Sequence, residues 1–365
     1  MKRTSAPKYM DLAEQLRRQI QTQVLRPGDQ LPTFAAMQTL HGATPTTVER
    51  VYRILEQEKL IMRHPRRGVF VAERQVPVRT GTLGVMDDVT RTFLNEEIPY
   101  YTRLNKGILT GAHRSGWEVL WLNAKSPGWE KVDGVLKYED WQCSVPMLIP
   151  WVSLLHPVQN VPSIVANEYA GMKMATEHLL QLGHRRIHCL LTVGDEFSQT
   201  RGVIVNELSQ KRVAGYQAAM WEAGIEPKPS SIHGLRVYGE PARPFEELGY
   251  DRVREWLNDG WNRDRCTALL TQNDGTAIGA LRALREAGIR VPEDLSMVGF
   301  DGTEMGEWIT PRLTSVEMPL RRIGELGVET LIRQIEGERV DDETVVLPMR
   351  LIKRDSTGPV PTGPG

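Results

Sequence analysis

The stretch HGATPTTVERVYRIL, residues 41–55, decides the fold of the N-terminal part of the chain. Gly42 can end one helix, and Thr44 with Pro45 can begin the next, because a threonine hydroxyl caps open N–H groups and proline fits the first helical turn. Apolar residues follow at helical spacing: Val48, Val51, Ile54 and Leu55. The stretch therefore predicts two helices joined by a tight turn, and it leaves Thr46 and Thr47 without a structural role.

The flanking sequence completes this unit. Apolar residues at helical spacing predict a helix over residues 8–24, the turn RPGDQLP follows, and TFAAMQTLHG (residues 33–42) predicts a short second helix. The third helix covers residues 44–59. After it, IMRH and VFVAE flank the basic turn PRRG, which indicates a hairpin. Three helices and a hairpin predict a winged helix-turn-helix over residues 1–74.

Charge is distributed unevenly along the chain. Residues 1–74 hold 13 Lys and Arg against 7 Asp and Glu, a surplus of +6, so the net charge of −1 leaves −7 for the rest. This asymmetry is expected when one part of a chain meets phosphate. Hydrophobic residues at 40% favour a globular protein over a disordered one, and no apolar run is long enough to span a bilayer. No secretory signal is present, so we expect a cytoplasmic protein without membrane attachment.

The third helix and the hairpin carry the candidate DNA contacts. In a helix-turn-helix the start of the second helix of the motif enters the major groove, where threonine can bond a phosphate or a base edge. Two exposed threonines could also merely begin a helix, but the cations at the hairpin tip favour a DNA contact. The predicted DNA-binding residues are Thr44, Thr46, Thr47, Arg50, His64, Arg66 and Arg67.

Residues 7–73 resemble the DNA-binding domain of the GntR family of bacterial transcription factors. The landmarks are G-D-Q-L-P, T-T-V, L-E-Q-E-K-L-I and R-G-V-F-V. The family often has arginine where this chain has Ala35, Pro45 and Glu49. The resemblance thus implies that three DNA contacts common in the family are absent. The threonines and the wing arginines would then make the remaining contacts with DNA.

Residues 75–80 read as a linker, and short apolar strands then alternate with amphipathic helices. Such alternation predicts parallel sheets flanked by helices, here in two lobes. Strands are expected in TLGVMD, WEVLWL, VDGVLKY, PMLIPW, SIVAN, RIHCLLTV, ALLTQND, LSMVGFD and TVVLPMRLI, and helices near residues 98–115, 170–182, 207–223, 249–259, 275–287 and 319–336.

Polar side chains at strand carboxyl ends are the candidate ligand contacts, because such folds bind ligands at that edge. Asn273 and Asp301 end two predicted strands, and Arg212 lies on a predicted helix. The alternatives are helix capping by Asn273 and Asp274, an Asx-turn at Asp301, and surface solvation of Arg212. Four aromatic residues, Trp129, Trp151, Trp308 and Phe245, are candidates for stacking on a sugar ring, although large aromatics more often belong to the core.

Residues 80–355 resemble the effector domain of the LacI/GalR family and the periplasmic sugar-binding proteins. The segments EHLLQLGHRRI, QNDGTAIGALRAL, VPEDLSMVGFDGTE and PRLTSVEMP carry this resemblance. By position, Arg212, Asn273 and Asp301 match ligand-binding residues of that family, and Asp87 and Asp88 fall near the contacts of the other lobe. Between WEVLWLN and VDGVL only AKSPGWEK intervenes, where the family has a helix, so the first lobe should be shortened there.

The two resemblances together are those of the arabinose-repressor group of the GntR family. They imply a dimeric transcriptional repressor that binds an operator in double-stranded DNA and a small carbohydrate effector, without a cofactor, metal or catalytic residues. The alternatives are a sugar-binding module without DNA binding, or an enzyme, for which no plausible nucleophile arrangement is found. Cys143, Cys189 and Cys266 show no metal-ligand or disulfide spacing.

The predicted domain division follows from these segments. It places the winged helix-turn-helix in residues 1–74, the linker in residues 75–80 and the effector domain in residues 81–355. The first lobe is expected to comprise residues 81–184 plus 317–340, and the second lobe residues 185–316 plus 341–355. Residues 356–365, rich in Gly and Pro, are expected to form a flexible tail.

Overall fold

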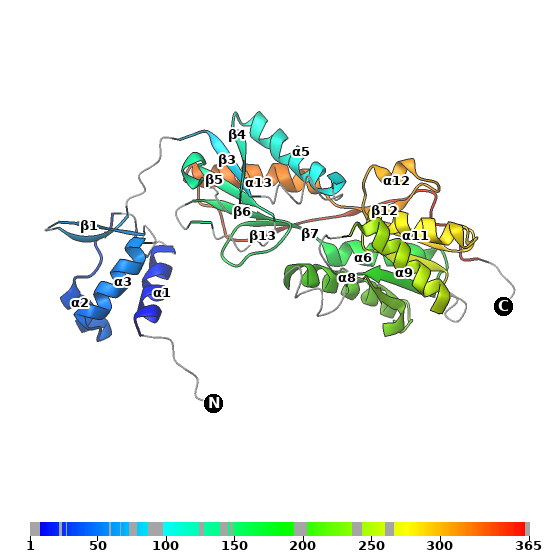
Figure 1. The fold of residues 1–365 in the computed structure, drawn as a ribbon, viewed down its shortest axis with the longest axis horizontal. Coiled ribbons are helices and arrows are strands. Elements are labelled where there is room, and N and C mark those ends of the chain that lie inside the picture. The colour runs from blue at the N-terminus through cyan, green and yellow to red at the C-terminus, as the bar shows by residue number, and fades with distance from the viewer. Residues whose placement is uncertain are drawn as a thin grey trace. The chain divides into compact units, whose positions relative to one another are not determined.

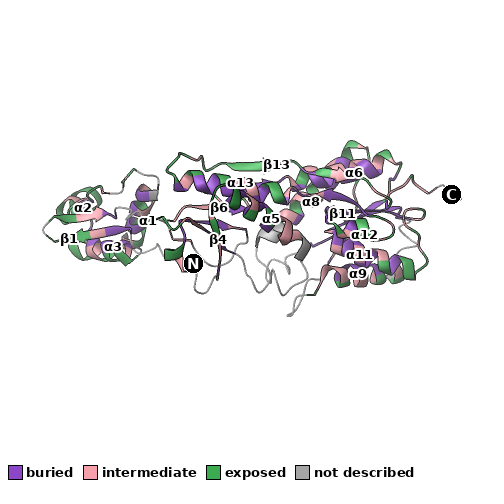
Figure 2. Cartoon of the chain, turned by 90° about the horizontal axis from the view of Figure 1, so that it is seen from above, coloured by how far each residue is buried: buried purple, intermediate pink, exposed green. Residues whose placement is uncertain are grey.

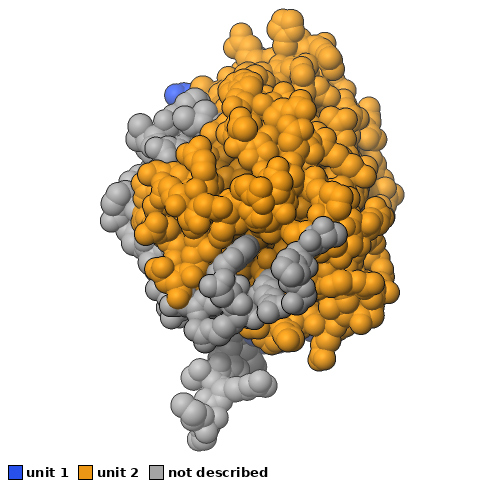
Figure 3. Space-filling view, turned by 90° about the vertical axis from the view of Figure 1, so that its right-hand side faces the viewer, with its two compact units in different colours: residues 1–80, 129–133, 144–150 blue, residues 81–128, 134–143, 151–365 orange. Residues whose placement is uncertain are grey.

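The computed structural model describes residues 8–21, 24–26, 28–57, 60–65, 67–72, 79–86, 98–123, 128–138, 145–146, 149–192, 203–235, 243–259 and 266–361. The chain forms two compact units, which Figure 3 colours separately. The first comprises residues 1–80, 129–133 and 144–150, and the second comprises residues 81–128, 134–143 and 151–365.

The first unit contains the predicted three helices and wing (Figure 1). Helices α1 (Lys8–Gln21), α2 (Phe34–His41) and α3 (Pro45–Gln57) precede the antiparallel pair β1 (Ile61–His64) and β2 (Gly68–Val71). All three helices and both strands contribute apolar residues to one core. Val48, Val51 and Leu55 of α3 are fully buried in it. The buried hydroxyl of Tyr52 donates to the carbonyl of Pro32 and ties α3 to the loop before α2.

The turn between α2 and α3 has the geometry that its sequence predicts. Thr33 caps α2, with its hydroxyl accepting from the N–H of Ala36 at 3.2 Å. Gly42 adopts a left-handed φ of 61°, and its N–H donates to the carbonyl of Gln38. A glycine ends the helix here because this conformation is strained for other residues.

The first sheet of the second unit is wholly parallel, in the order β13-β7-β6-β5-β3-β4. Helices α5 (Ile98–Arg114) and α13 (Leu320–Ile335) pack against each other, and α13 also packs against β5, β6 and β7. We call this sheet and its two helices the first lobe. Its strands are β3 (Thr82–Met86), β4 (Glu118–Leu122), β5 (Gly134–Lys137), β6 (Trp151–Leu154), β7 (Ser163–Ala166) and β13 (Thr344–Leu347).

The second sheet has the order β14-β12-β11-β10-β8-β9, and only its edge strand β14 runs antiparallel. Its strands are β8 (Ile187–Leu191), β9 (Ile232–Gly234), β10 (Ala268–Thr271), β11 (Ser296–Asp301), β12 (Thr314–Glu317) and β14 (Arg350–Ile352). This sheet and its helices form the second lobe. The helices are α6 (Glu168–Gln181), α8 (Val203–Glu222), α9 (Phe245–Asp259), α11 (Asp274–Glu286) and the short α12 (Met305–Trp308).

The helices of the second lobe form two pairs, α6 with α8 and α9 with α11. Helix α6 packs against β10, β12 and β14, and α11 packs against β10 and β11. Every residue of β11 is buried, whereas α9 and α11 turn an exposed face outward (Figure 2). Two 3-10 turns, η1 (Trp129–Lys131) and η2 (Pro229–Ser231), complete the described elements. The connection from β4 to β5 spans residues 123–133, and its described part contains η1, in line with the shortened connection that was predicted.

The chain passes between the two lobes three times, each time at the carboxyl end of a strand. It leaves β7 for α6, β12 for α13 and β13 for β14. These connections are short, so the carboxyl ends of both sheets lie at the junction between the lobes. The binding edge of each sheet therefore faces the other lobe.

Two of the predicted lobe limits differ from the structure. Helix α6 packs on the second sheet, although residues up to 184 were predicted in the first lobe. Strand β13 pairs with β7 in the first sheet, from Thr344↔Ser163 to Leu347↔Ala166, although residues 341–355 were predicted in the second lobe. The single predicted strand TVVLPMRLI splits at Pro348, because proline cannot continue the ladder.

The prediction of a flexible tail is wrong for residues 356–360. Ser356 is fully buried, its carbonyl accepts from Met297 N at 2.7 Å, and its hydroxyl accepts from Thr314 N at 2.8 Å. Gly358 N donates to the hydroxyl of Ser296, and Val360 N donates to the carbonyl of Leu182. Main-chain hydrogen bonds hold this segment, so it needs few apolar side chains.

Candidate functional sites

The start of α3 separates the three threonines by role. The hydroxyl of Thr44 accepts from the N–H of Thr47 at 3.2 Å, and the two hydroxyls lie 2.9 Å apart. Thr44 is thus the cap of α3, and Thr47 is engaged by it. Thr46 is exposed on the same turn, and its hydroxyl makes no hydrogen bond with the described residues. Thr46 is therefore the threonine whose hydroxyl is left for an outside partner.

Arg50 is exposed on α3 one turn further on. Its guanidinium lies over the ring of Tyr9 in α1, 4.2 Å from the ring centroid. This cation–π contact links two helices and holds the guanidinium at the surface without neutralising it. The charge of Arg50 stays available to a phosphate.

Glu49, which stands where GntR relatives often have arginine, is paired within the unit. Arg63 of β1 donates to both of its carboxylate oxygens at 3.0 Å and to Glu56 at 2.9 Å. The hydrogen bond from Arg63 lowers the pKa of Glu49. This bidentate pair ties the wing to α3. It also neutralises an acidic group that would otherwise repel DNA, and it engages Arg63 itself.

The tip of the wing presents His64 and Arg67, both exposed. The ring of His64 meets Phe70 edge-on with centroids 5.3 Å apart, and the guanidinium of Arg67 lies 5.9 Å from the centroid of Phe70. Gln30 donates to the carbonyl of Arg67 at 2.9 Å, which fixes the turn. Gly68 has a φ of 112° and lies so close to Gln30 that a Cβ would clash. Arg66 lies outside the described residues.

Arg212 is the central charged residue of the second lobe. It lies on α8, is only 6% exposed, and donates from Nε to Glu168 at 2.6 Å and from Nη1 to the carbonyl of Gln272. Its guanidinium carbon lies over the ring of Phe300, 3.8 Å from the ring centroid. The alternative that Arg212 is merely solvated is therefore wrong.

The charges around Arg212 keep it protonated. Burial lowers the pKa of Arg212, but the carboxylates of Glu168 and Asp301 more than offset this and raise it above its usual value. Tyr100 of α5, in the first lobe, also acts on this guanidinium. Arg212 is thus held as a cation in a buried site.

Asp301 is the last residue of β11 and is buried. Its φ of 95° lies in the left-handed region, which is uncommon outside glycine, and its carbonyl accepts from Met318 N at 3.3 Å. Gly302 follows and donates its N–H to the hydroxyl of Ser315 at 3.1 Å. Strained backbone held by its surroundings often marks a ligand contact.

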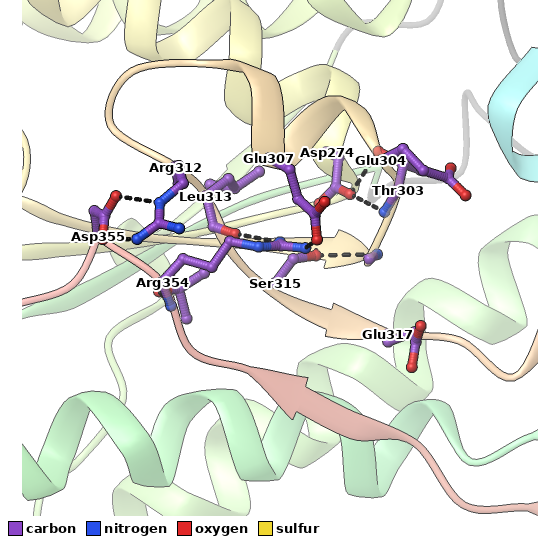
Figure 4. Close-up of polar contacts among 12 residues, drawn as sticks. Asp274, Thr303, Glu304, Glu307, Arg312, Leu313, Ser315, Glu317, Arg354 and Asp355 are labelled. Atoms are coloured by element: carbon purple, nitrogen blue, oxygen red, sulfur yellow. Dashed lines mark hydrogen bonds and ion pairs between the residues drawn. The ribbon is translucent and has the colours of Figure 1, made fainter.

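Of the neighbouring residues Asn273 and Asp274, only Asn273 caps helix α11. Asn273 is the N-cap of α11, and its Oδ1 accepts from the N–H and the hydroxyl of Thr276, each at 2.8 Å. Asp274 is not the cap. Its carboxylate accepts from the N–H and the hydroxyl of Thr303 at 2.6 and 2.8 Å and from Ser315 at 2.6 Å (Figure 4). Burial raises the pKa of Asp274 to about 6, although these hydrogen bonds and Arg354 oppose the shift.

The remaining predicted ligand residues are placed as follows. Phe245 begins α9 beside Gly275, at the same end of the sheet as Asn273. Trp151 is the first residue of β6, at the amino end of that strand, and Nζ of Lys137, the last residue of the neighbouring β5, lies 5.8 Å from its ring centroid. The structure therefore does not bring Trp151 to the junction between the lobes. Asp87 and Asp88 lie outside the described residues.

The structure adds residues that the sequence did not single out. Glu168, Gln272 and Phe300 surround Arg212, and Gln272 also accepts from Thr192 N at 3.2 Å. Glu168 comes two residues after Ala166, the last residue of the buried strand β7, so its position after a strand end was the available signal. Among the described residues, no cluster of three potential metal ligands is present, and no helix is long and apolar enough to cross a membrane.

Comparison with known proteins agrees with both units. Residues 8–71 match the family model of the bacterial regulatory proteins of the gntR family, and residues 176–357 match that of the periplasmic binding protein-like domain. The chain is 35% identical over 214 residues to the HTH-type transcriptional regulator DegA of Bacillus subtilis, covering 59% of this chain and 57% of that protein. It is 30% identical over 193 residues to the HTH-type transcriptional repressor PurR of Vibrio vulnificus, covering 53% and 52%.

The alignments thus span little more than half the length of these two relatives. Among solved structures, a LacI family transcriptional regulator from Enterococcus faecium with bound ribose matches with a TM-score of 0.61 at 24% identity, covering 76% of this chain and 99% of that chain. This likeness shows the two-lobed fold. The chain therefore joins an N-terminal domain that matches the gntR family model to a second domain that matches the periplasmic binding protein-like model and has the two-lobed fold of that solved structure.

Proposed function

We propose that this protein is a sequence-specific DNA-binding transcription regulator, a repressor whose operator binding is controlled by a small carbohydrate held between the two lobes. One observation carries the proposal. The chain joins a gntR-type domain that exposes Thr46, Arg50 and Arg67 to a two-lobed domain that gathers Arg212 and Asp301 at the junction between its lobes.

The first unit supplies what DNA binding requires. The start of α3 offers the hydroxyl of Thr46 to a base edge or phosphate, and Arg50 lies one turn away on the same helix. His64 and Arg67 at the tip of the wing would meet phosphates or the minor groove, as would Arg66. Thr44 and Thr47 hold the start of α3 in shape, so their contribution to DNA binding is through position.

The second unit supplies what a polyhydroxyl ligand requires. A carboxylate such as Asp301 accepts hydroxyl protons, and the guanidinium of Arg212 donates to hydroxyl oxygens from a fixed plane. Asn273 keeps its amide nitrogen for a ligand, since its oxygen caps α11. Phe245 lies at the same end and could contact a sugar face. The ribose in the Enterococcus faecium regulator supports a carbohydrate for this chain.

The proposed mechanism is thermodynamic linkage between the two sites. A ligand that binds both lobes favours one orientation of the lobes relative to each other. The affinity for DNA changes if the ligand-bound and ligand-free orientations bind DNA differently. Coupling of this kind is typically about 1–3 kcal/mol. We propose a homodimer in the cytoplasm, because two DNA-binding domains on half-sites about 34 Å apart give both affinity and palindromic specificity.

Operator selection with the purified chain tests this proposal. Double-stranded DNA enriched from a random pool should bind with an affinity that falls steeply with salt, and Arg67→Ala should weaken binding and flatten the salt dependence. A chain reduced to residues 79–365 should lose DNA binding and keep carbohydrate binding. If the full chain selects no sequence, the protein is a sugar-binding module instead.

We propose no catalytic activity. The relatives named above are transcription regulators. Incubation of the chain with a bound carbohydrate, followed by chromatography, should return the carbohydrate unchanged. Conversion of the ligand would indicate an enzyme.

A further inference from the structure

The cation of the proposed effector site already has a buried counter-ion. Glu168 is 3% exposed and Arg212 is 6% exposed, and Oε2 of Glu168 lies 2.6 Å from Nε of Arg212. Nη1 donates to the carbonyl of Gln272, and the guanidinium face is covered by Phe300. Nη2 makes no hydrogen bond with the described residues and so remains to donate to a ligand.

Carboxylates balance the charge of Arg212. Asp301 is a second carboxylate whose charge raises the pKa of Arg212, so two carboxylates act on one cation. A neutral hydroxyl can accept from Nη2 and donate to Asp301 without bringing charge. An anionic ligand would add a third negative charge to a buried site whose only cation, among the described groups that act on it, is already paired.

Glu168 is held in place independently of Arg212. It is the first residue of α6, where the helix dipole favours a carboxylate, and Asn167 caps the helix by accepting from Ala170 N at 3.0 Å. Helices α6 and α8 touch through their backbones, since a Cβ on Gly215 would lie 2.3 Å from the carbonyl oxygen of Tyr169. Gly215 thus permits this close approach of the two helices, and the approach itself does not require a charge on Glu168.

We propose that Glu168 is a specificity-determining residue that restricts the effector to uncharged polyhydroxyl compounds and excludes sugar acids and sugar phosphates. This inference rests on the proposed function and names the ligand class of its effector site. Glu168 acts by neutralising Arg212 and by adding to the negative field of Asp301. Removing its charge while keeping its shape should therefore admit anions.

Matched ligand pairs test the inference on the full-length chain. The probes are D-glucose and D-glucuronate, D-galactose and D-galacturonate, and D-ribose and D-ribose 5-phosphate, at constant ionic strength. Binding is measured by thermal shift and by tryptophan fluorescence titration. At least one neutral compound should bind the unaltered chain at least about tenfold more tightly than its charged partner, which corresponds to about 1.4 kcal/mol.

Variants of α6 separate charge from shape. Glu168→Gln keeps an acceptor for Nε of Arg212 and should reduce this preference by about tenfold or reverse it. Glu168→Asp keeps the charge and should keep the preference. Glu177→Gln is the matched control, because Glu177 lies on the same helix, its side chain is 44% exposed, and its ion pair within the described residues is with Lys173, at 3.6 Å. It should change nothing.

Three results would overturn the inference. They are a charged compound binding the unaltered chain as tightly as its neutral partner, a Glu168→Gln variant that folds yet keeps the full preference, and failure of every neutral compound to bind. If Glu168→Gln does not fold, the Glu168→Asp variant and the ligand pairs decide. A sugar acid that releases operator DNA would contradict this inference while supporting the proposed function, whereas absence of DNA binding would contradict the proposed function alone.

Discussion

The two candidate sites are built in opposite ways. In the first unit the proposed DNA contacts are exposed and held by light local contacts, such as Arg50 on the ring of Tyr9. In the second unit the proposed ligand contacts are buried and belong to the core, where Arg212 meets Glu168 and Phe300. A DNA-reading surface can therefore change with little effect on folding. The effector site cannot, because its specificity and its stability depend on the same side chains.

The largest difference is expected at the two arginines. Arg212→Met leaves Glu168 buried without its cation, which should lower the free energy of unfolding by roughly 3–5 kcal/mol. Arg67→Met removes an exposed side chain and should change it by less than about 0.5 kcal/mol. Urea unfolding followed by circular dichroism measures both.

The double variant Glu168→Gln, Arg212→Met serves as the control for this pair. It removes both charges and should recover part of the loss, because no unpaired carboxylate remains buried. A loss below about 1 kcal/mol in Arg212→Met would show that the buried pair contributes little and would remove the contrast between the sites.

The buried carboxylate of Asp274 should make the stability of the second unit depend on pH. Its folded-state pKa is about 6 against an ordinary value of 3.8, so between these pH values the folded chain binds more protons than the unfolded chain. Stability from this group is therefore present below about pH 4 and is lost as the pH rises through 6, by about 3 kcal/mol in total. Asp274→Asn lacks this loss, so its stability relative to the unaltered chain should rise by that amount between pH 4 and 7.

Asp355 provides the exposed counterpart. Arg312 donates two hydrogen bonds to the Asp355 carboxylate, at 2.7 and 3.0 Å (Figure 4), and these lower the pKa of Asp355. The sign is therefore opposite: its contribution is present above the ordinary pKa and is lost as the pH falls through the lowered value. Asp355→Asn should show only a small effect, confined to acidic pH. Parallel pH profiles for the two variants would contradict the assignment of Asp274.

The threonines of α3 test the division of roles within the first unit. Thr44→Ala removes the cap and should destabilise α3 by about 1 kcal/mol, seen as faster amide hydrogen exchange in residues 45–57. Thr46→Ala should leave that exchange unchanged and weaken operator binding several-fold, measured by fluorescence anisotropy. Equal effects of the two variants on exchange would show that Thr46 is structural.

Sequence periodicity predicted most of the fold because helices and buried strands repeat locally. All three helices and the wing of the first unit were predicted, as were the main alternating elements of the second. The failures share a cause. Strand β9 has only three residues, and β12 (Thr314–Glu317) has a single apolar residue, so neither shows a pattern. Strand β6 begins at Trp151, where the predicted strand PMLIPW ends, and the tail is held by hydrogen bonds that leave no apolar side-chain pattern.

The candidate sites divide along the same line. The sequence indicated the positions of Thr46, Arg67, Arg212 and Asp301, because strand ends and helix starts are local features. It could not indicate that Glu49 is neutralised by Arg63 or that Glu168 is the partner of Arg212, 44 residues away. Such pairs depend on which elements pack together in the folded chain. The resemblance to known families gives no information at positions where this chain has a different residue from the family.

The smallest expected effect concerns an exposed ion pair at the junction between the lobes. Arg103 of α5 in the first lobe lies 3.2 Å from Glu304 and 3.7 Å from Glu317, both in the second lobe. Partly exposed pairs contribute at most about 1 kcal/mol, so Arg103→Ala should change carbohydrate affinity by less than about fivefold and leave unfolding nearly unaffected. Arg114→Ala, which removes a looser pair with Glu325 at 3.9 Å inside the first lobe, should not change affinity at all. If Arg103→Ala instead lowered the free energy of unfolding as much as Arg212→Met, the strength of an ion pair in this protein would not depend on its exposure.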